Sequence, residues 1–226
     1  MNVELGPGVE ARARKSLGIS NDAILQMVGR VLERNRISGD CVVDVGCGAG
    51  NFYHQVRTRF ARYIGVDVVR YEDFPEHAEF RSFDLDSGRI PLPDHSADLV
   101  TAIEVIEHLE NPRDLMRKLA RLVKPGGWVI VTTPNQLSLL SLLTLVTKHR
   151  FQAFQDTHYP AHLTALLECD LKRIASECGL GEIEINYSLE GRIPGTAWHY
   201  PQPLSRCFPR ALSENILMIG RRNIGS

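Results

Sequence analysis

Three glycines alternate with small residues directly after a short apolar run in residues 42–52, VVDVGCGAGNF. Glycine adopts positive φ angles without strain and lets a ligand come close to the backbone. A valine-rich run followed by such a turn is typical of a buried strand that enters a loop and then a helix. The G-x-G-x-x-G spacing of dinucleotide-binding folds would need a glycine where Asn51 stands. The segment therefore predicts a strand–loop–helix ligand site with a different spacing.

Strand-like and helix-like segments alternate along most of the chain. The expected strands span residues 40–46, 63–68, 78–86, 97–105, 128–134, 182–190 and 213–222. The expected helices span residues 21–36 (capped by Asn21 or Ser20), 51–61, 112–123, 137–147 and 164–180 (capped by Thr164), with a loop over 190–210. This alternation predicts an α/β fold with a mostly parallel sheet and helices on both faces. Ligands bind such sheets beyond the carboxyl ends of the strands.

Composition narrows the classes of protein that fit. The 226 residues suit a single domain, and 26 Lys and Arg against 27 Asp and Glu leave a net charge of −1. That balance argues against a nucleic-acid partner. Five cysteines without a C-x-x-C pair argue against a disulfide framework and fit a cytoplasmic location. The apolar run 137–146 is about half the length of a membrane span, so no span is expected.

The D-x-G-x-G-x-G spacing that starts at Asp44 resembles the first motif of class I S-adenosylmethionine-dependent methyltransferases. The later segment KPGGWVIVTTPN, residues 124–135, resembles the same family. The resemblance covers residues 38–190 and is strongest to the broad branch of ubiquinone-biosynthesis O-methyltransferases. It implies one Rossmann-like domain over residues 1–226, with a seven-stranded sheet whose last strand is antiparallel. It also implies an N-terminal helical segment at 1–37 and an acceptor lid insertion at 136–165.

The resemblance further implies how S-adenosylmethionine is held. The Gly46–Gly50 backbone would pack on its methionine portion, and Asp44 would hold its ammonium group, as an acid suits a cationic ligand. Asp67 would accept hydrogen bonds from the ribose hydroxyls, and Asp84 would face the adenine amino group. The implied cofactor-binding set is Asp44, Gly46, Cys47, Gly48, Gly50, Asp67, Val68, Asp84, Leu85 and Glu104.

The segment EVIEH places Glu104, Glu107 and His108 after the fourth expected strand, where the cofactor's methyl group would meet an acceptor. Three interpretations stay open. The residues are structural, at the start of a helix. Alternatively His108 is a general base that a glutamate orients. Alternatively the three side chains bind a divalent ion such as Mg²⁺, Mn²⁺ or Fe²⁺.

The metal interpretation needs a further ligand, and the segment DTHYPAH offers His162 or His158. An E-x-x-E-H string with a later histidine resembles small-RNA 3′-terminal 2′-O-methyltransferases, in which two glutamates and two histidines hold an ion. That resemblance implies the set Glu104, Glu107, His108 and His162, with His158 as the alternative.

The expected reaction is transfer of a methyl group from S-adenosylmethionine to a hydroxyl of a small molecule, such as one with adjacent hydroxyls. The alternatives are an RNA 3′-terminal 2′-O-methyltransferase and a non-catalytic, cofactor-binding regulatory protein. The leucine-rich residues 137–146 allow a buried helix, a homodimer interface or a hydrophobic acceptor site. Trp198, His199 and Tyr200 either line an acceptor pocket or pack their own loop against the molecule.

Overall fold

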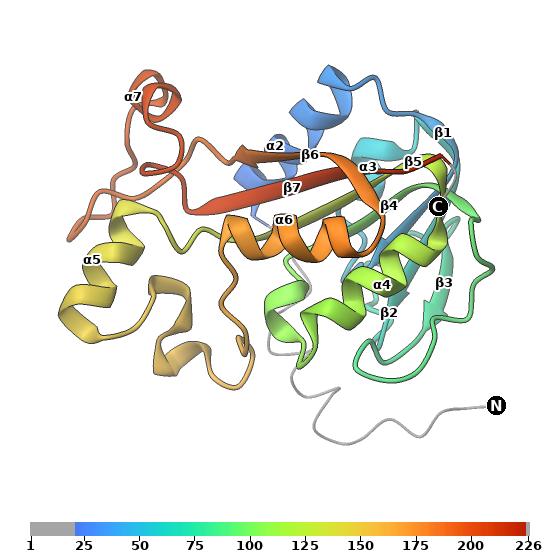
Figure 1. The fold of residues 1–226 in the computed structure, drawn as a ribbon, viewed down its shortest axis with the longest axis horizontal. Helices are drawn as coiled ribbons and strands as arrows, with labels where there is room; N and C mark the ends of the chain where they lie inside the picture. The colour runs from blue at the N-terminus through green and yellow to red at the C-terminus, as the bar shows by residue number, and fades with distance from the viewer. Residues whose placement is uncertain (1–20, 225–226) are drawn as a thin grey trace.

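The computed structural model describes residues 21–224, and its centre is one seven-stranded sheet with the strand order β3-β2-β1-β4-β5-β7-β6 (Figure 1). The strands are β1 (Gly39–Val45), β2 (Phe60–Asp67), β3 (Glu79–Ser82), β4 (Ala97–Ile103), β5 (Val123–Pro134), β6 (Leu180–Tyr187) and β7 (Asn215–Arg222). Only β7 runs against its neighbours, pairing antiparallel with β5 and β6. The predicted α/β fold, including the antiparallel last strand, is confirmed.

Helices cover both faces of the sheet and create two separate cores. The four helices against the sheet are α2 (Asp22–Arg34), α3 (Tyr53–Val56), α4 (Pro112–Leu122) and α6 (Glu168–Glu177). Alternate residues of β1 point to opposite faces. Val42 packs in the core that contains the apolar residues of α2 and α3, whereas Val43 and Val45 pack in the core of α4 and α6. Both faces of β1 are therefore buried, as its run of valines predicts.

The polar residues at the starts of two helices determine where those helices begin. The Asn21 side chain accepts a hydrogen bond from the backbone of Ala23, which confirms one of the two expected caps. Asn111 does the same for Asp114, and Pro112 occupies the first turn of α4. Within residues 21–224, no helix has the length and the apolar character that crossing a membrane would need.

Two predicted helices were too long, each because a longer-range contact uses the same backbone. The expected helix 51–61 is only the four-residue α3, since Phe60 already pairs with Gly39 of β1. The expected helix 164–180 begins at Glu168 instead, with Leu167 as its cap. Thr164 is not the cap, because its backbone N–H donates to the carbonyl of Glu107 and its hydroxyl to the carbonyl of Leu109.

Other boundaries also moved. The third strand ends at Ser82 because residues 83–87 turn, and β5 starts at Val123 because Ala97 of β4 pairs with it there. The region 190–210, predicted as a loop, contains the short helix α7 (Gln202–Cys207).

The segments outside the sheet gather at one end of the molecule. The region 136–165 contains α5 (Leu139–Lys148) and two 3₁₀ turns, η2 (Gln152–Phe154) and η3 (Asp156–His158). Figure 1 shows α5 and α7 together at the left end, beyond the strands. A third 3₁₀ turn, η1 (Ile106–His108), follows β4 directly and carries the EVIEH segment to the edge of the sheet.

Candidate functional site

A pocket of about 480 Å³ opens beyond the carboxyl ends of β1, β2 and β4, where the strand order reverses. Its lining consists of Asn21, Ile24, Asp44, Gly46, Cys47, Gly48, Asn51, Phe52, Asp67, Val68, Tyr71, Phe83, Asp84, Leu85, Asp86, Ile103, Glu104, Val105, Glu107, His108, Leu109, Thr157, His158, Ala161, His162 and Asn215. The structure thus brings together every residue of the expected cofactor set except Gly50. The pocket also has the size of an ordinary small-molecule site.

The glycine loop is held against its surroundings by close packing. Gly46 has φ +73°, and a Cβ there would lie 2.3 Å from Cγ2 of Val105. Gly50 has φ +80°, and a Cβ there would lie 2.6 Å from Cδ of Pro75. Positive φ and contacts this short both exclude a side chain. Gly50 serves the packing of the loop and does not line the pocket, whereas Gly46 does both.

Two aspartates, Asp44 of β1 and Asp67 of β2, lie next to the glycine loop. Asp44 accepts hydrogen bonds from the hydroxyls of Tyr63 and Thr101, each 2.6 Å long. Burial nevertheless raises the pKa of Asp44 to about 6. Asp67 accepts from the backbone of Gly48 at 2.9 Å, and burial raises its pKa as well. A cation bound beside these carboxylates would offset the cost of burying their charge.

Asp84 and Leu85 lie in the turn that follows β3. The Asp84 side chain accepts from the backbone of Asp86 at 3.0 Å, and the carbonyl of Leu85 accepts from the Lys118 ammonium at 2.6 Å. These contacts hold the turn at the rim of the pocket, where Phe83 also lines it.

Several lining residues were not predicted from the sequence. Ile24 comes from α2 and Asn21 is the residue that caps it, and neither stands in a ligand motif. Asn215 enters because it pairs with Pro134 at the start of β7, and it donates to Oε2 of Glu104 at 3.3 Å. Phe83 and Asp86, which flank the predicted Asp84 and Leu85, and Val105, within the EVIEH segment, had a sequence signal. The other contributions depend on tertiary contacts.

The charge of the pocket restricts what it can bind. Within residues 21–224, the lining contains no lysine or arginine. It contains six carboxylates, those of Asp44, Asp67, Asp84, Asp86, Glu104 and Glu107. S-adenosylmethionine carries a sulfonium and an ammonium group, so these residues fit it. A dinucleotide would bring a pyrophosphate into the same acidic space without a cation to meet it.

Glu107, His108 and His162 form the tightest cluster in the pocket. One ligand atom from each side chain lies within 4.8 Å of the other two. The side chain of Glu107 is fully buried, and within the described part of the chain neither carboxylate oxygen makes a hydrogen bond of good geometry. The Thr133 hydroxyl and the backbone N–H of Glu107 lie close enough to favour its charged form only weakly. Buried carboxylates are normally paired. The arrangement is therefore incomplete without a proton or a cation.

Backbone carbonyls orient both imidazoles of the cluster. Nδ1 of His108 lies 2.8 Å from the carbonyl oxygen of Ala161, and Nδ1 of His162 lies 2.6 Å from that of Ala153. A carbonyl only accepts, so each Nδ1 is the protonated nitrogen and each Nε2 of the neutral ring has a free lone pair. Burial and the neighbouring His108 lower the pKa of His162 to about 4, which keeps its ring neutral.

The region 136–165 reaches this cluster through two backbone hydrogen bonds. The N–H groups of Leu163 and Thr164 donate to the carbonyl of Glu107, at 2.8 and 3.0 Å. His162 is thereby placed against His108, with ring centres 4.8 Å apart. His158 stacks on His162 with ring centres 5.4 Å apart and lines the pocket, but it is outside the three-residue cluster.

Glu104 lies beside the cluster without joining it. Its Oε1 accepts from the Thr132 hydroxyl at 3.1 Å, and its backbone has φ +57°. Such a φ in a non-glycine residue is often found at functional sites. Burial, followed by the nearby Glu107, raises the pKa of Glu104 to about 8. Burial likewise raises the pKa of Glu107 to about 7, so the two carboxyls do not readily ionise together.

The loop that contains Trp198 does not contribute to the pocket, so the first of its two expected roles is wrong. Trp198, His199 and Tyr200 do not line the pocket, and the Trp198 side chain is 78% exposed. Backbone hydrogen bonds from Ile193 to Trp198 and from Tyr200 to Gly191 hold this loop in shape without burying the indole.

Comparison with known proteins gives consistent matches. The family described as a methyltransferase domain matches residues 20–182. A ubiquinone biosynthesis O-methyltransferase of Chromobacterium violaceum is 29% identical over 153 residues, 64% of this chain and 66% of that protein. One of Nitrosospira multiformis is 25% identical over 70% of both chains. The chain spans about half to seven-tenths of the length of the curated relatives it matches.

Solved structures agree on the fold. One chain of the complex between the Haloferax volcanii Trm112 methyltransferase activator and a methyltransferase has a TM-score of 0.64, at 19% identity over 95% of both chains. A SAM-dependent methyltransferase from Archaeoglobus fulgidus has a TM-score of 0.60, at 20% identity over 88% of this chain and 94% of that one. The family match over residues 20–182 places the chain in the methyltransferase-domain family, and its fold is that of class I S-adenosylmethionine-dependent methyltransferases.

Proposed function

We propose that the protein transfers a methyl group from S-adenosylmethionine to a hydroxyl of a small molecule that carries two adjacent hydroxyls, with the help of a divalent cation. The observation that carries this proposal is the cluster of Glu107, His108 and His162, in which the carboxylate is fully buried and makes no hydrogen bond of good geometry among the described residues. The names of the relatives, which are O-methyltransferases, support a hydroxyl acceptor.

The residues that would hold the cation are Glu107, His108 and His162, with Glu104 and His158 close by. One carboxylate and two imidazoles suit Mn²⁺ or Fe²⁺ better than Mg²⁺, which prefers oxygen ligands. A bound cation would position two neighbouring acceptor oxygens and lower the pKa of a hydroxyl. The carbonyls of Ala161 and Ala153 keep both Nε2 atoms available for it.

Methyl transfer itself requires few further groups from the chain. The acceptor oxygen, once it has lost its proton, forms a bond to the methyl carbon while the bond from sulfur to that carbon breaks. The sulfonium leaves as neutral S-adenosylhomocysteine. The pocket's contribution is to align the two reactants and to take the proton. Without a cation, the Nε2 lone pair of His108 is the base within the pocket.

The pocket favours a small acceptor over an RNA end. Its six carboxylates would repel a phosphate backbone, and the chain's net charge of −1 provides no general attraction for nucleic acid. A non-catalytic role would keep the cofactor pocket but would not need Glu107 to be buried without a hydrogen bond of good geometry.

Two measurements test the proposal in sequence. Calorimetry with S-adenosylmethionine and with NAD should show binding of the first only, because of the acidic lining. Radiolabelled methyl transfer to a catechol should then require Mn²⁺, Fe²⁺ or Mg²⁺ and stop with EDTA, whereas phenol should be a poor acceptor.

Each measurement can fail separately. Transfer that continues at the same rate after exhaustive chelation would remove the cation and leave His108 as the base. Tight cofactor binding with no transfer to any hydroxyl acceptor would favour a regulatory role.

A further inference from the structure

Two neighbouring strands hold the carboxylate of Glu104 in one orientation. The Thr132 hydroxyl of β5 accepts from the backbone N–H of Glu104 at 2.9 Å and donates to its Oε1 at 3.1 Å. Asn215, at the start of β7, donates from Nδ2 to Oε2 of Glu104 at 3.3 Å. Each carboxylate oxygen therefore has a donor on the protein side. The fold orients this side chain by itself and needs no bound ligand to do so.

The backbone at Glu104 is strained, and the sheet maintains the strain. Its φ of +57° is a conformation that residues other than glycine rarely adopt. Ile103, the preceding residue, pairs with Thr132, and Pro134 pairs with Asn215, so the pairing of the strands fixes both partners of the carboxylate. Strain that the surrounding structure maintains in this way is concentrated at ligand sites.

The contact with Glu104 also determines which way the Asn215 amide is turned. An ionised carboxylate only accepts hydrogen bonds, so the amide nitrogen faces Glu104. No described residue donates to the remaining amide atom, Oδ1 of Asn215. Both side chains line the pocket. The Glu104–Asn215 pair thus offers hydrogen-bond acceptors to whatever the pocket binds.

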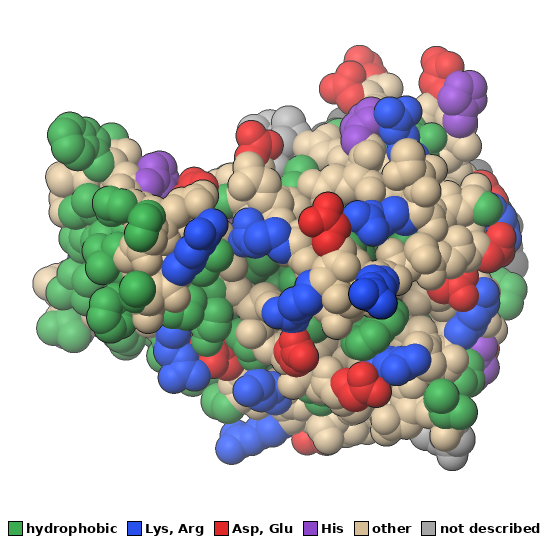
Figure 2. All heavy atoms as spheres, turned by 90° about the horizontal axis from the view of Figure 1, so that it is seen from above, with side chains coloured by type: hydrophobic (Ala, Val, Ile, Leu, Met, Phe, Trp, Pro, Cys, Tyr) green, Lys and Arg blue, Asp and Glu red, His purple; other side chains and the backbone are tan. Residues whose placement is uncertain are grey.

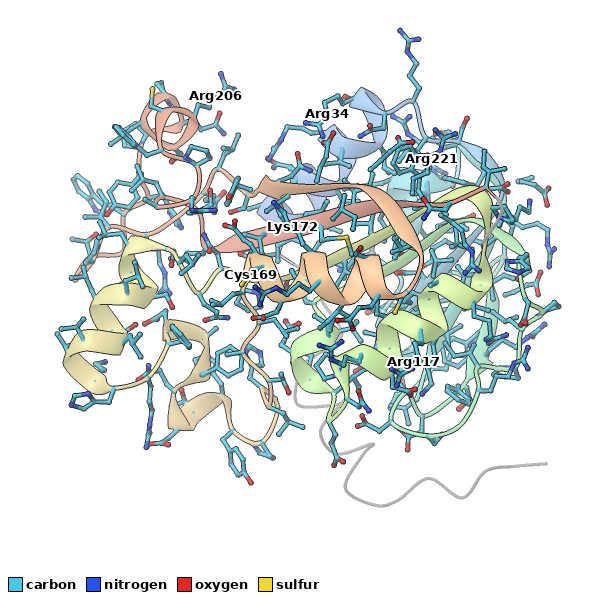
Figure 3. All side chains as sticks on the ribbon, viewed as in Figure 1. Arg34, Arg117, Cys169, Lys172, Arg206 and Arg221 are labelled. Atoms are coloured by element: carbon cyan, nitrogen blue, oxygen red, sulfur yellow. The ribbon has the colours of Figure 1, made fainter. Side chains whose placement is uncertain are left out.

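No positively charged side chain of the described chain lines the pocket beside this pair. Lysine and arginine side chains are instead spread, among acidic ones, over the outer face that Figure 2 shows. Arg34, Lys172 and Arg206, labelled in Figure 3, lie on α2, α6 and α7. A ligand group that donates hydrogen bonds and carries positive charge therefore matches the pair in both respects.

The other positive groups that the pocket would receive have residues of their own. The cluster of Glu107, His108 and His162 would hold the divalent cation. Asp44, near the end of β1, would lie beside the ammonium group of S-adenosylmethionine, as the family resemblance implies. The Glu104–Asn215 pair is then left for the methyl acceptor.

We propose that the methyl acceptor carries a protonated amine in addition to its adjacent hydroxyls, and that the Glu104–Asn215 pair binds this ammonium group. The inference rests on the proposed function, because it concerns the acceptor of the same reaction. Glu104 and Oδ1 of Asn215 each accept one of the three ammonium protons. The protonated nitrogen has no lone pair, so the methyl group is transferred to a hydroxyl oxygen and the amine only binds.

The same pair discriminates against an acceptor that carries a carboxylate. Such a group would face Glu104, a charge of the same sign, and Oδ1 of Asn215, which has no proton to donate. A neutral acceptor avoids the repulsion but leaves the pair without a partner. The expected order of preference is therefore ammonium, neutral, carboxylate.

The test compares three catechols that differ in one group: dopamine, 4-methylcatechol and 3,4-dihydroxyphenylacetate. The ratio kcat/KM should fall in that order, by about tenfold or more between the first and the last. Calorimetry in the presence of S-adenosylhomocysteine should give the same order of affinities without turnover. Equal kcat/KM values for the three would overturn this inference alone, whereas transfer to none of them would overturn the proposed function with it.

Two variants assign the preference to the pair. Asn215→Leu should reduce the preference for dopamine over 4-methylcatechol about tenfold, because the amide no longer orients Glu104 or accepts from the ammonium group. Glu104→Gln should reduce it in the same way, because the charge is lost. Asn223→Leu, at an exposed asparagine beyond β7 and outside the pocket, is the matched control and should leave it unchanged.

Unchanged circular dichroism and melting would show that each variant is folded, and the comparison of catechols with the native chain needs no variant. An Asn215→Leu variant that binds S-adenosylmethionine more weakly but keeps the native order of catechols would assign the pair to the cofactor and overturn the inference.

Discussion

At the scale of single residues, Glu107 is the most informative side chain. Its carboxylate is fully buried and makes no hydrogen bond of good geometry among the described residues, and such a group destabilises a folded protein unless a proton or a cation neutralises it. The fold keeps Glu107 at this position even so, with Glu104 beside it and two imidazoles facing it. Conformational stability and ligand binding therefore place opposite demands on the same carboxyl.

We predict that Glu107→Gln stabilises the metal-free protein at pH 8. The pKa of Glu107 is raised to about 7 by burial, so between pH 4.5 and about 7 the folded state binds more protons than the unfolded state. The free energy of unfolding then falls as pH rises through that range. The neutral amide avoids this loss, which amounts to about 3 kcal/mol.

Thermal melts of the metal-free protein at pH 5 and pH 8 measure the effect. Glu107→Gln should melt several degrees above the native chain at pH 8 and near it at pH 5. The exposed Glu110→Gln is the control and should follow the native chain at both values. A Glu107→Gln variant that is less stable at pH 8 would show that the native carboxylate has a partner.

Single-residue contacts also distinguish the two candidate metal ligands, His162 and His158. Since His162, and not His158, lies in the cluster with Glu107 and His108, we predict that His162→Ala weakens Mn²⁺ binding by at least tenfold, in line with the loss of a ligand. His158→Ala, which removes only the stacked neighbour, should weaken it far less. Calorimetry with Mn²⁺ alone distinguishes them, and the reverse order would assign His158 as the ligand.

At the scale of elements, the turn after β1 decides whether the pocket forms. Gly46 combines φ +73° with a 2.3 Å approach to Val105, a residue of the segment after β4. The glycine thus holds together two strand ends that lie far apart in the sequence. A methyl group here would push Val105, and with it Glu104 and Glu107, away from the cofactor.

We predict that Gly46→Ala lowers the affinity for S-adenosylmethionine by at least tenfold and the free energy of unfolding by about 2 kcal/mol, because both the φ angle and the contact are unfavourable. Gly88→Ala is the control, since nothing lies within 4 Å of a Cβ there. Adding Val105→Ala to Gly46→Ala should restore only part of the loss. Full restoration would mean that the backbone angle contributes nothing.

Elements with a strong local pattern were predictable from the sequence. Neighbouring residues specify the valine run of β1, the glycine loop and the start of α4 at its proline. The acids at the ends of β1, β2 and β4 were predictable for the same reason. The early end of α3 and the late start of α6 were not predictable, because Phe60 and Thr164 are used by partners elsewhere in the chain. For the same reason the sequence could not choose between His162 and His158, or reveal Asn215.

At the scale of the whole molecule, two surfaces of opposite character share the region 136–165. Its first half contains α5, which exposes leucine and valine side chains, and its second half supplies Thr157, His158, Ala161 and His162 to the acidic pocket. The sheet supports both surfaces, because β5 leads into the region and the carbonyl of Glu107 accepts the hydrogen bonds at its end. The exposure of these apolar side chains was not predictable from the leucine content of α5, which fits a buried helix equally well.

The hydrogen bond from His108 to Ala161 joins residues 53 positions apart. A cation held by His108 and His162 would turn that weak link into a cross-link, comparable with a disulfide in the loop that it closes. The region between would then lose most of its freedom to open locally. Limited proteolysis should accordingly cut within residues 136–165 several times more slowly with Mn²⁺ than with EDTA, and His162→Ala should abolish the difference.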